Sequence, residues 1–122
     1  MESEKKECAA ILFCGDFNGP PEEPFHARLH QLGYRSAHRL RHGREPDYTW
    51  PTGIQAPLMD HGPAECLDYV YIWADERYEV RVTDAAVWGK EPSPRDKTLF
   101  PSDHAAVKAS LEIRRRAPAA SL

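Results

Sequence analysis

Apolar and polar positions along the chain predict four strands. Residues 9–14 form an uninterrupted apolar run, which is typical of a buried strand. Residues 66–73 form a second apolar and aromatic run that contains one aspartate. Residues 78–87 and 105–113 alternate between apolar and polar side chains, which predicts strands with one buried and one solvated face.

The same pattern predicts one helix, over residues 22–32. Phe25, Leu29 and Leu32 recur at helical spacing. Two glutamates stand in the first turn and Gly33 follows the last apolar residue. Acidic residues at the start and a glycine at the end are typical helix boundary signals.

The remaining segments lack such periodicity. Residues 34–63 contain few periodic apolar positions and several Gly and Pro, which predicts a long surface excursion with a short strand at 48–50. Residues 89–101 contain three prolines and are expected to form a loop. We expect residues 1–8 to be a charged leader and residues 114–122 a disordered tail.

Composition and charge limit the class of protein. With 122 residues the chain can form one domain with a real core, and its net charge of −3 does not predict strong charge-driven binding to nucleic acid. A nucleic-acid substrate held at a local site remains compatible with that charge.

The three cysteines of the chain are odd in number and lack CxxC spacing, which predicts reduced thiols in an intracellular protein of the cytoplasm or nucleus. No apolar stretch approaches 18 residues, so we expect no membrane partner.

The first candidate site residues follow directly after the first apolar run. Asp16 and Asn18 are two positions apart, so they point the same way from a strand end. A carboxylate and a carboxamide there can hold a metal-bound water and a phosphate oxygen. An ordinary Gly-Asp turn is the alternative interpretation of this short stretch.

Two further motifs supply partners. Asp68 stands among apolar neighbours, and a buried unpaired carboxylate costs several kcal/mol, so it requires a hydrogen-bonding partner. Asp103 and His104 come directly before the last predicted strand. If the strands are neighbours, these residues face Asp16 and Asn18, and Asp68 forms a carboxylate–imidazole pair with His104.

Three motifs in this order resemble the C-terminal half of the endonuclease/exonuclease/phosphatase superfamily. They are Gly15-Asp16-Phe17-Asn18, Leu67-Asp68-Tyr69-Val70 and Ser102-Asp103-His104. In the forms Cys-Gly-Asp-Phe-Asn, Cys-Leu-Asp-Tyr-Val and Pro-Ser-Asp-His they are most similar to the nocturnin, angel and carbon-catabolite-repression deadenylases. The resemblance implies an α/β fold over residues 9–113, a partial two-layer β-sandwich with a flanking helix. This is about half of a deoxyribonuclease-I-like domain.

The resemblance also implies roles and a cofactor. Asp16 would align the attacking water, Asn18 would orient water and phosphate, and His104 would contact the scissile phosphate. Asp68 would hold His104, and Asp103 together with Asp16 and His104 would bind Mg²⁺ or Mn²⁺. The implied activity is metal-dependent phosphodiester hydrolysis, in particular 3′–5′ exoribonuclease action on the 3′ end of RNA such as poly(A).

One departure from the family pattern limits this expectation. The N-terminal half of such domains supplies an early Asn and a metal-binding Glu, whereas here only the charged leader precedes Ala9. We therefore expect a fragment that is slow or inactive alone, with apolar sheet surface that a missing half or a dimer partner would cover. The alternatives are a phosphomonoesterase acting on a small substrate and a non-catalytic interaction module.

Other candidates have simpler interpretations. His26 and His30 have the four-residue spacing of metal ligands, but a solvated helix face is favoured because no acidic or Cys partner is placed near them. Tyr48 and Trp50 are expected in a core or hairpin rather than stacked on a base. Residues 114–116 are expected to be a solvated basic cluster.

Overall fold

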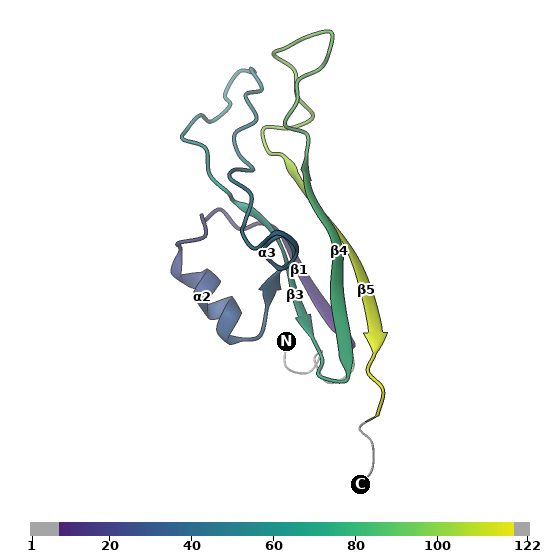
Figure 1. Cartoon of the computed structure of the whole chain (residues 1–122). Helices are drawn as coiled ribbons and strands as arrows, with labels where there is room; N and C mark the ends of the chain where they lie inside the picture. Colours follow the sequence, from purple (N-terminus) through teal and green to yellow (C-terminus); the bar gives the residue numbers. More distant parts are fainter. Residues whose placement is uncertain (1–7, 119–122) are drawn as a thin grey trace.

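The computed structural model describes residues 8–118 and shows two antiparallel sheets with two short helices (Figure 1). The elements in chain order are β1 (Ala10–Asp16), α2 (Pro24–Gln31), β2 (Arg35–Ser36), α3 (Ala37–His42), β3 (Asp68–Ala74), β4 (Tyr78–Trp88) and β5 (Ala106–Arg115). The predicted α/β class, a partial sandwich of antiparallel sheets with a flanking helix, is confirmed. Neither helix in these residues is long and apolar enough to cross a membrane.

The first sheet places the ends of two strands side by side. Its order is β1-β3-β2, so β3 is central and β1 lies at an edge. The antiparallel register of β1 and β3 runs from Ala10 opposite Ala74 to Asp16 opposite Asp68. Two carboxylates therefore meet at one end of this sheet.

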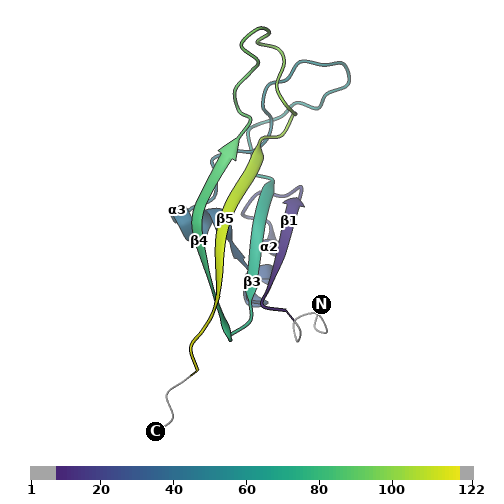
Figure 2. The same ribbon diagram turned by 90° about the vertical axis from the view of Figure 1, so that its right-hand side faces the viewer.

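The second sheet is a long two-stranded ribbon of β4 and β5. A register shift between Val82 and Asp84 marks a bulge in β4, a device that increases local twist. Figure 2 shows the ribbon running beside β3, with its loop end at the same end of the molecule as the loops that follow α3. This arrangement brings the start of β5 close to the paired ends of β1 and β3.

The core is aromatic and lies against the first sheet. Tyr34, Cys66, Tyr69 and Tyr71 form its buried cluster, and Phe17 packs against it. The Phe17 ring stacks on Tyr71 with centroids 5.7 Å apart. Aromatic pairs of this kind contribute about 0.5–1.5 kcal/mol beyond the area that they bury.

The predicted surface excursion at 34–63 is wrong in its first half. This segment contains β2 and α3, and Tyr34, Ala37 and Thr49 are fully buried. The Ser36 side chain caps α3 by accepting a hydrogen bond from the Arg39 N–H. A six-residue helix spans less than two turns, so it leaves too few apolar repeats to be detected in the sequence.

The prediction of a buried first strand is also wrong. Leu12 and Phe13 in β1 are 52% and 45% exposed, because β1 is an edge strand. An apolar run indicates that the strand would be stabilised by burial. It does not indicate whether another element covers the strand. The expectation that apolar sheet surface remains uncovered is met at these residues.

The predicted boundary of the disordered tail needs correction as well. β5 continues through Arg115, two residues beyond the predicted end of this strand, and the backbone N–H of Arg116 donates to the Arg77 carbonyl. Residues 114–116 are exposed, as predicted. Most of the predicted leader, residues 1–7, and the last residues, 119–122, lie outside the described part of the chain.

Candidate active site

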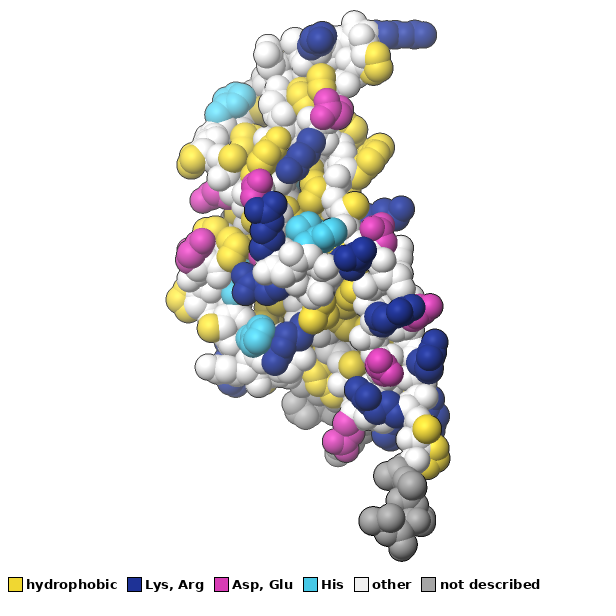
Figure 3. All heavy atoms as spheres, in the orientation of Figure 1, with side chains coloured by type: hydrophobic (Ala, Val, Ile, Leu, Met, Phe, Trp, Pro, Cys, Tyr) yellow, Lys and Arg dark blue, Asp and Glu magenta, His cyan; other side chains and the backbone are white. Residues whose placement is uncertain are grey.

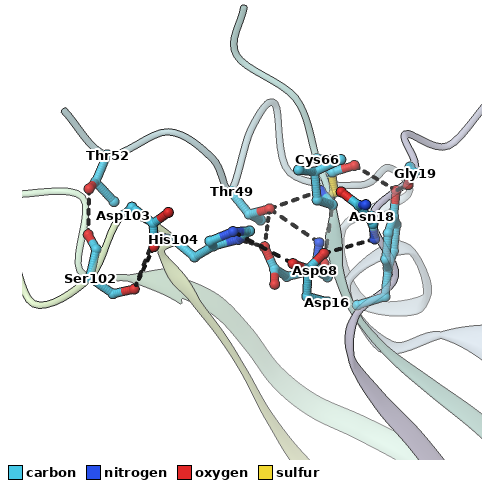
Figure 4. A network of polar contacts seen from close by, with 12 residues as sticks. Asp16, Asn18, Gly19, Thr49, Thr52, Cys66, Asp68, Ser102, Asp103 and His104 are labelled. Atoms are coloured by element: carbon cyan, nitrogen blue, oxygen red, sulfur yellow. Dashed lines mark hydrogen bonds and ion pairs between the residues drawn. The ribbon is translucent and has the colours of Figure 1, made fainter. Parts of the chain in front are cut away.

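Three side chains from three separate elements meet at the loop end of the sheets (Figure 4). Asp16 is the last residue of β1, Asp68 is the first residue of β3, and His104 comes just before β5. Their ligand-capable atoms all lie within 4.8 Å of one another. The side chains of Asp16, Asp68 and His104 are 46%, 16% and 25% exposed, so the cluster opens to solvent on the Asp16 side.

The predicted contact between Asp68 and His104 is present. Nδ1 of His104 lies 2.8 Å from Oδ2 of Asp68. Because a carboxylate only accepts, the contact assigns the Nδ1 hydrogen to this bond. In the neutral ring Nε2 then keeps its lone pair, and this atom lies 3.6 Å from Oδ2 of Asp16. The imidazole is thus held at one nitrogen and available at the other.

Opposing effects act on the pKa of His104. Burial, the largest single effect, lowers the pKa because it disfavours the charged ring. The hydrogen bond to Asp68 and the negative charges of Asp68, Asp16 and Asp103 raise it, and together they outweigh burial. The net result is a pKa above the usual value for histidine, so the protonated ring persists to higher pH than in a free histidine.

Thr49 is a site residue that the sequence did not identify. Its Oγ1 donates to Oδ2 of Asp68 at 2.7 Å and accepts the N–H groups of Leu67 at 2.9 Å and Asp68 at 3.2 Å. The Thr49 carbonyl also accepts the N–H of Ala105 at 2.7 Å. Thr49 therefore positions both the carboxylate and the residue next to His104. Its only sequence signal was membership of the Tyr48–Trp50 triplet.

The loop before His104 is pinned by a second set of hydrogen bonds. The His104 N–H donates to Oγ of Ser102 at 3.1 Å. The hydroxyl of Thr52 donates to the Ser102 carbonyl, and the Thr52 N–H donates to the Asp103 carbonyl at 2.9 Å. These bonds hold the loop at 102–104 against residues 49–52, as Figure 4 shows.

The other two predicted site residues lie at the margin of the cluster. The backbone N–H of Asn18 donates to Oδ1 of Asp16 at 2.8 Å, and Asn18 adopts a left-handed φ of 53°, which asparagine tolerates well. This bond leaves Oδ2 of Asp16 facing His104. Asp103 accepts a hydrogen bond from Ser102 and lies outside the three-residue cluster. A direct role for Asn18 and metal binding by Asp103 stay predictions.

The donor set fits a hard divalent cation. Carboxylate oxygens are the ligands that Mg²⁺ and Mn²⁺ favour, and Mg²⁺ commonly binds through one or two carboxylates while it keeps several waters. Asp16 and Asp68 supply two carboxylates, and the exposure of Asp16 leaves room for waters and substrate. The ligand chemistry of the cluster therefore matches the predicted cofactor class.

The prediction that His26 is solvated is wrong. His26 is buried, and its Nε2–H donates to the Gly19 carbonyl at 3.1 Å. Its Nδ1 lies 2.6 Å from the hydroxyl of Tyr71. Burial, reinforced by the Glu45 carboxylate, raises the pKa of Tyr71 to about 12, so this hydroxyl stays protonated and donates to His26. His26 is thus a core residue, whereas His30 is exposed as expected.

Comparison with known proteins gives one match. A family model described as the Endonuclease/Exonuclease/phosphatase family matches residues 2–104. The matched range includes all three residues of the cluster and ends at His104. No curated protein sequence matches the chain.

Proposed function

Because the chain belongs to the endonuclease/exonuclease/phosphatase family, a family of phosphodiester and phosphate ester hydrolases, we propose that it is a metal-dependent phosphodiesterase that shortens RNA from its 3′ end. One observation carries the proposal. An imidazole held at Nδ1 by one carboxylate places its Nε2 3.6 Å from a second, exposed carboxylate. Acid–base and electrostatic groups are then available at one place for phosphoryl transfer.

The mechanism assigns each side chain a step. Oδ2 of Asp16 accepts a proton from the water that attacks phosphorus, the bond from phosphorus to the leaving 3′ oxygen breaks, and that oxygen takes up a proton from solvent. The protonated ring of His104 donates its Nε2–H to a phosphoryl oxygen and stabilises the negative charge that develops there. Asp68 holds the ring and keeps it protonated, and Thr49 holds Asp68. Asn18 holds Asp16 through its backbone N–H, and its side chain orients the water.

A divalent cation, Mg²⁺ or Mn²⁺, would be held by the carboxylates of Asp16 and Asp68, with Asp103 as a further predicted ligand. The sequence-based expectation that His104 also binds the metal requires the neutral ring, so it does not apply to the protonated ring that donates to the phosphoryl oxygen. When bound, the cation would supply positive charge beside the phosphoryl oxygens. The exposure of Asp16 supports this placement.

Two features support RNA as the substrate. The motifs around Asp16, Asp68 and His104 have the form seen in deadenylases, which implies poly(A). The ring of Trp50 lies 6.3 Å from the His104 ring and is half-buried. An aromatic side chain beside the reacting groups offers a stacking platform for an unpaired base.

Two further observations support a partner chain and an intracellular compartment for the enzyme. The exposed apolar side chains of β1 suggest a covering partner, either the N-terminal half of such a domain or a second copy of this chain. Cys14 and Cys66 are free thiols, which supports a reducing compartment, the cytoplasm or the nucleus.

The test is hydrolysis of a 5′-labelled oligoadenylate by the purified chain in Mg²⁺ and in EDTA. We expect slow stepwise shortening in Mg²⁺ only, because the chain lacks the N-terminal metal-binding Glu of the family pattern. The changes Asp16→Ala and His104→Ala should each lower kcat/KM by at least about 100-fold, since loss of one such group costs roughly 3 kcal/mol. Lys108→Ala, on the exposed side of β5, is the control and should leave the rate unchanged.

Three outcomes would contradict the proposal. Folded wild-type protein that leaves the oligoadenylate intact would favour the non-catalytic alternative. Hydrolysis of a small phosphomonoester in its place would favour the phosphatase alternative. A His104→Ala variant with near-normal rate would remove this histidine from the mechanism.

A further inference from the structure

Positive charge is concentrated in one segment of this acidic chain. Residues 24–44 contain five of the sixteen basic residues and none of the nineteen acidic residues. The net charge of −3 therefore hides a strong local asymmetry. A segment with basic residues and no acidic ones is the electrostatic footprint of a polyanion-binding surface.

Three of these arginines project from α3 and its C-terminal end, and we call Arg39, Arg41 and Arg44 the α3 arginines. All three are exposed. Arg41 has no carboxylate within ion-pair distance among residues 8–118, and its Nε donates only a long bond, 3.4 Å, to the Thr83 carbonyl. Its guanidinium is therefore available to an external anion.

The other two α3 arginines each have one carboxylate partner. Arg44 lies 3.7 Å from Asp47, and these side chains are 75% and 77% exposed. Such an exposed pair contributes only about 0–1 kcal/mol, so a phosphate group can displace or share Asp47 at low cost. Arg39 lies 3.9 Å from Glu45, whose side chain is only 7% exposed, so Arg39 keeps this partner while its own half-exposed side chain adds positive charge to the surface.

The backbone that carries the α3 arginines is held firmly. Ser36 caps the start of α3, and Gly43 ends it in a left-handed conformation with φ of 81°. His38 donates to the Arg44 carbonyl at 2.6 Å, and His42 donates to the Ala85 carbonyl of β4 at 2.5 Å. Long side chains on a fixed backbone lose less entropy when they bind.

The α3 arginines come shortly before a site residue, Thr49, in the sequence. The segment that follows α3 rises toward the loop end of the sheets (Figure 1), and it contains Thr49, which bonds Asp68. Figure 3 shows dark blue side chains across the middle of the face that carries α3. α3 packs against β3 and β4, so it lies next to the strands that run to the loop end of the sheets, where the site is found.

We propose that the α3 arginines bind the phosphate backbone of single-stranded RNA upstream of the 3′ end that occupies the Asp16–Asp68–His104 site. This inference rests on the proposed function, because it assumes an RNA substrate. It adds that affinity for the polymer comes from α3, whereas bond cleavage comes from the cluster.

The test compares two double variants with the same change in charge. Arg41→Gln with Arg44→Gln removes two α3 arginines, and Arg114→Gln with Arg115→Gln removes two arginines at the far end of β5. Binding of labelled oligoadenylate is measured by fluorescence anisotropy in EDTA at several salt concentrations. Hydrolysis of bis(p-nitrophenyl) phosphate in Mg²⁺ is measured in parallel.

Loss of two phosphate contacts should make the plot of log K against log salt shallower by about 1.4, since each contact to a single strand contributes about 0.7. The β5 variant should keep the wild-type slope, and Arg41→Lys with Arg44→Lys should also keep it. All variants should hydrolyse the small diester at the wild-type rate. Circular dichroism melting verifies that each variant is folded.

Equal salt slopes for the α3 and β5 variants would overturn this inference, as would a wild-type chain that does not bind the oligoadenylate. Failure of the proposed function gives a different result, because then neither the wild type nor any variant hydrolyses the small diester.

Discussion

Asp68 illustrates how one oxygen atom organises a site. Its Oδ2 accepts hydrogen bonds from both Thr49 and His104, at 2.7 and 2.8 Å. Because Thr49 also accepts two backbone N–H groups, the hydroxyl is fixed in the direction of the carboxylate. The position of the imidazole is thus determined by the backbone of β3 and the loop at residue 49.

The pKa of His104 predicts a pH effect on stability in metal-free protein. A pKa raised by folding means that the folded state binds a proton more tightly than the unfolded chain. The stabilisation is fully present below the unfolded pKa of about 6.5 and is lost as the pH rises through the folded pKa. Urea unfolding in EDTA between pH 5.5 and 8.5 measures it.

The matched variant for this prediction is His104→Gln. The difference in unfolding free energy between wild type and variant should shrink as the pH rises, since only the wild type loses a proton at this position. A difference that is constant across the pH range would contradict the prediction.

At the scale of elements, the two histidines of α2 look alike in sequence but have different environments. His26 and His30 stand four positions apart, yet only His26 joins the helix to the sheet, through Tyr71, and to the Gly19 carbonyl. Aromatic rings surround it, including Phe25 at a centroid distance of 4.1 Å. His26 therefore anchors α2 to the core.

Truncation of the two histidines should give very different results. His26→Ala leaves the Tyr71 hydroxyl without its partner, removes one of the two hydrogen bonds to the Gly19 carbonyl and opens a cavity, so we expect a loss of roughly 3 kcal/mol in unfolding free energy. His30→Ala, at an exposed position of the same helix, should change it by less than about 0.5 kcal/mol. Urea denaturation of the pair measures both, and equal losses would refute the anchoring role.

The arrangement of the elements also explains which site residues could be predicted from the sequence. Asp16, Asp68 and His104 were identified because each stands at the end of a strand with a strong apolar signal. Thr49 was missed because its bond to Asp68 spans 19 residues and leaves no local pattern. His26 was misplaced because helical spacing states which residues share a face and not what that face contacts.

At the scale of the whole molecule, apolar side chains remain exposed on both sheets. Leu12 in β1, Trp88 in β4 and Ile113 in β5 are each about half or more exposed. From residue 8 to residue 15 the β1 segment has no charged residue and no proline, so its open edge lacks the usual protection against pairing. We therefore propose that a neighbouring chain pairs along β1.

We therefore expect the isolated chain to self-associate with increasing concentration. Leu12→Lys places a charge on the open β1 edge and should shift sedimentation velocity profiles toward monomer, with a change in stability within about 0.5 kcal/mol. Gln55→Lys adds the same charge in an exposed loop and should leave the profiles unchanged. A Leu12→Lys variant that associates as strongly as wild type would contradict this expectation.

The cluster draws its members from distant parts of the chain, and this has a kinetic consequence. Asp68 and His104 are 36 residues apart, and β1 reaches Asp68 only by pairing across the whole segment between them. Such pairings raise contact order. Loops of this length must close, at a cost in chain entropy, before the contacts between their ends can offset that cost. We conclude that the three side chains come together late in folding, so a ligand of the cluster recognises only the finished molecule and adds its binding free energy to the stability of the native state.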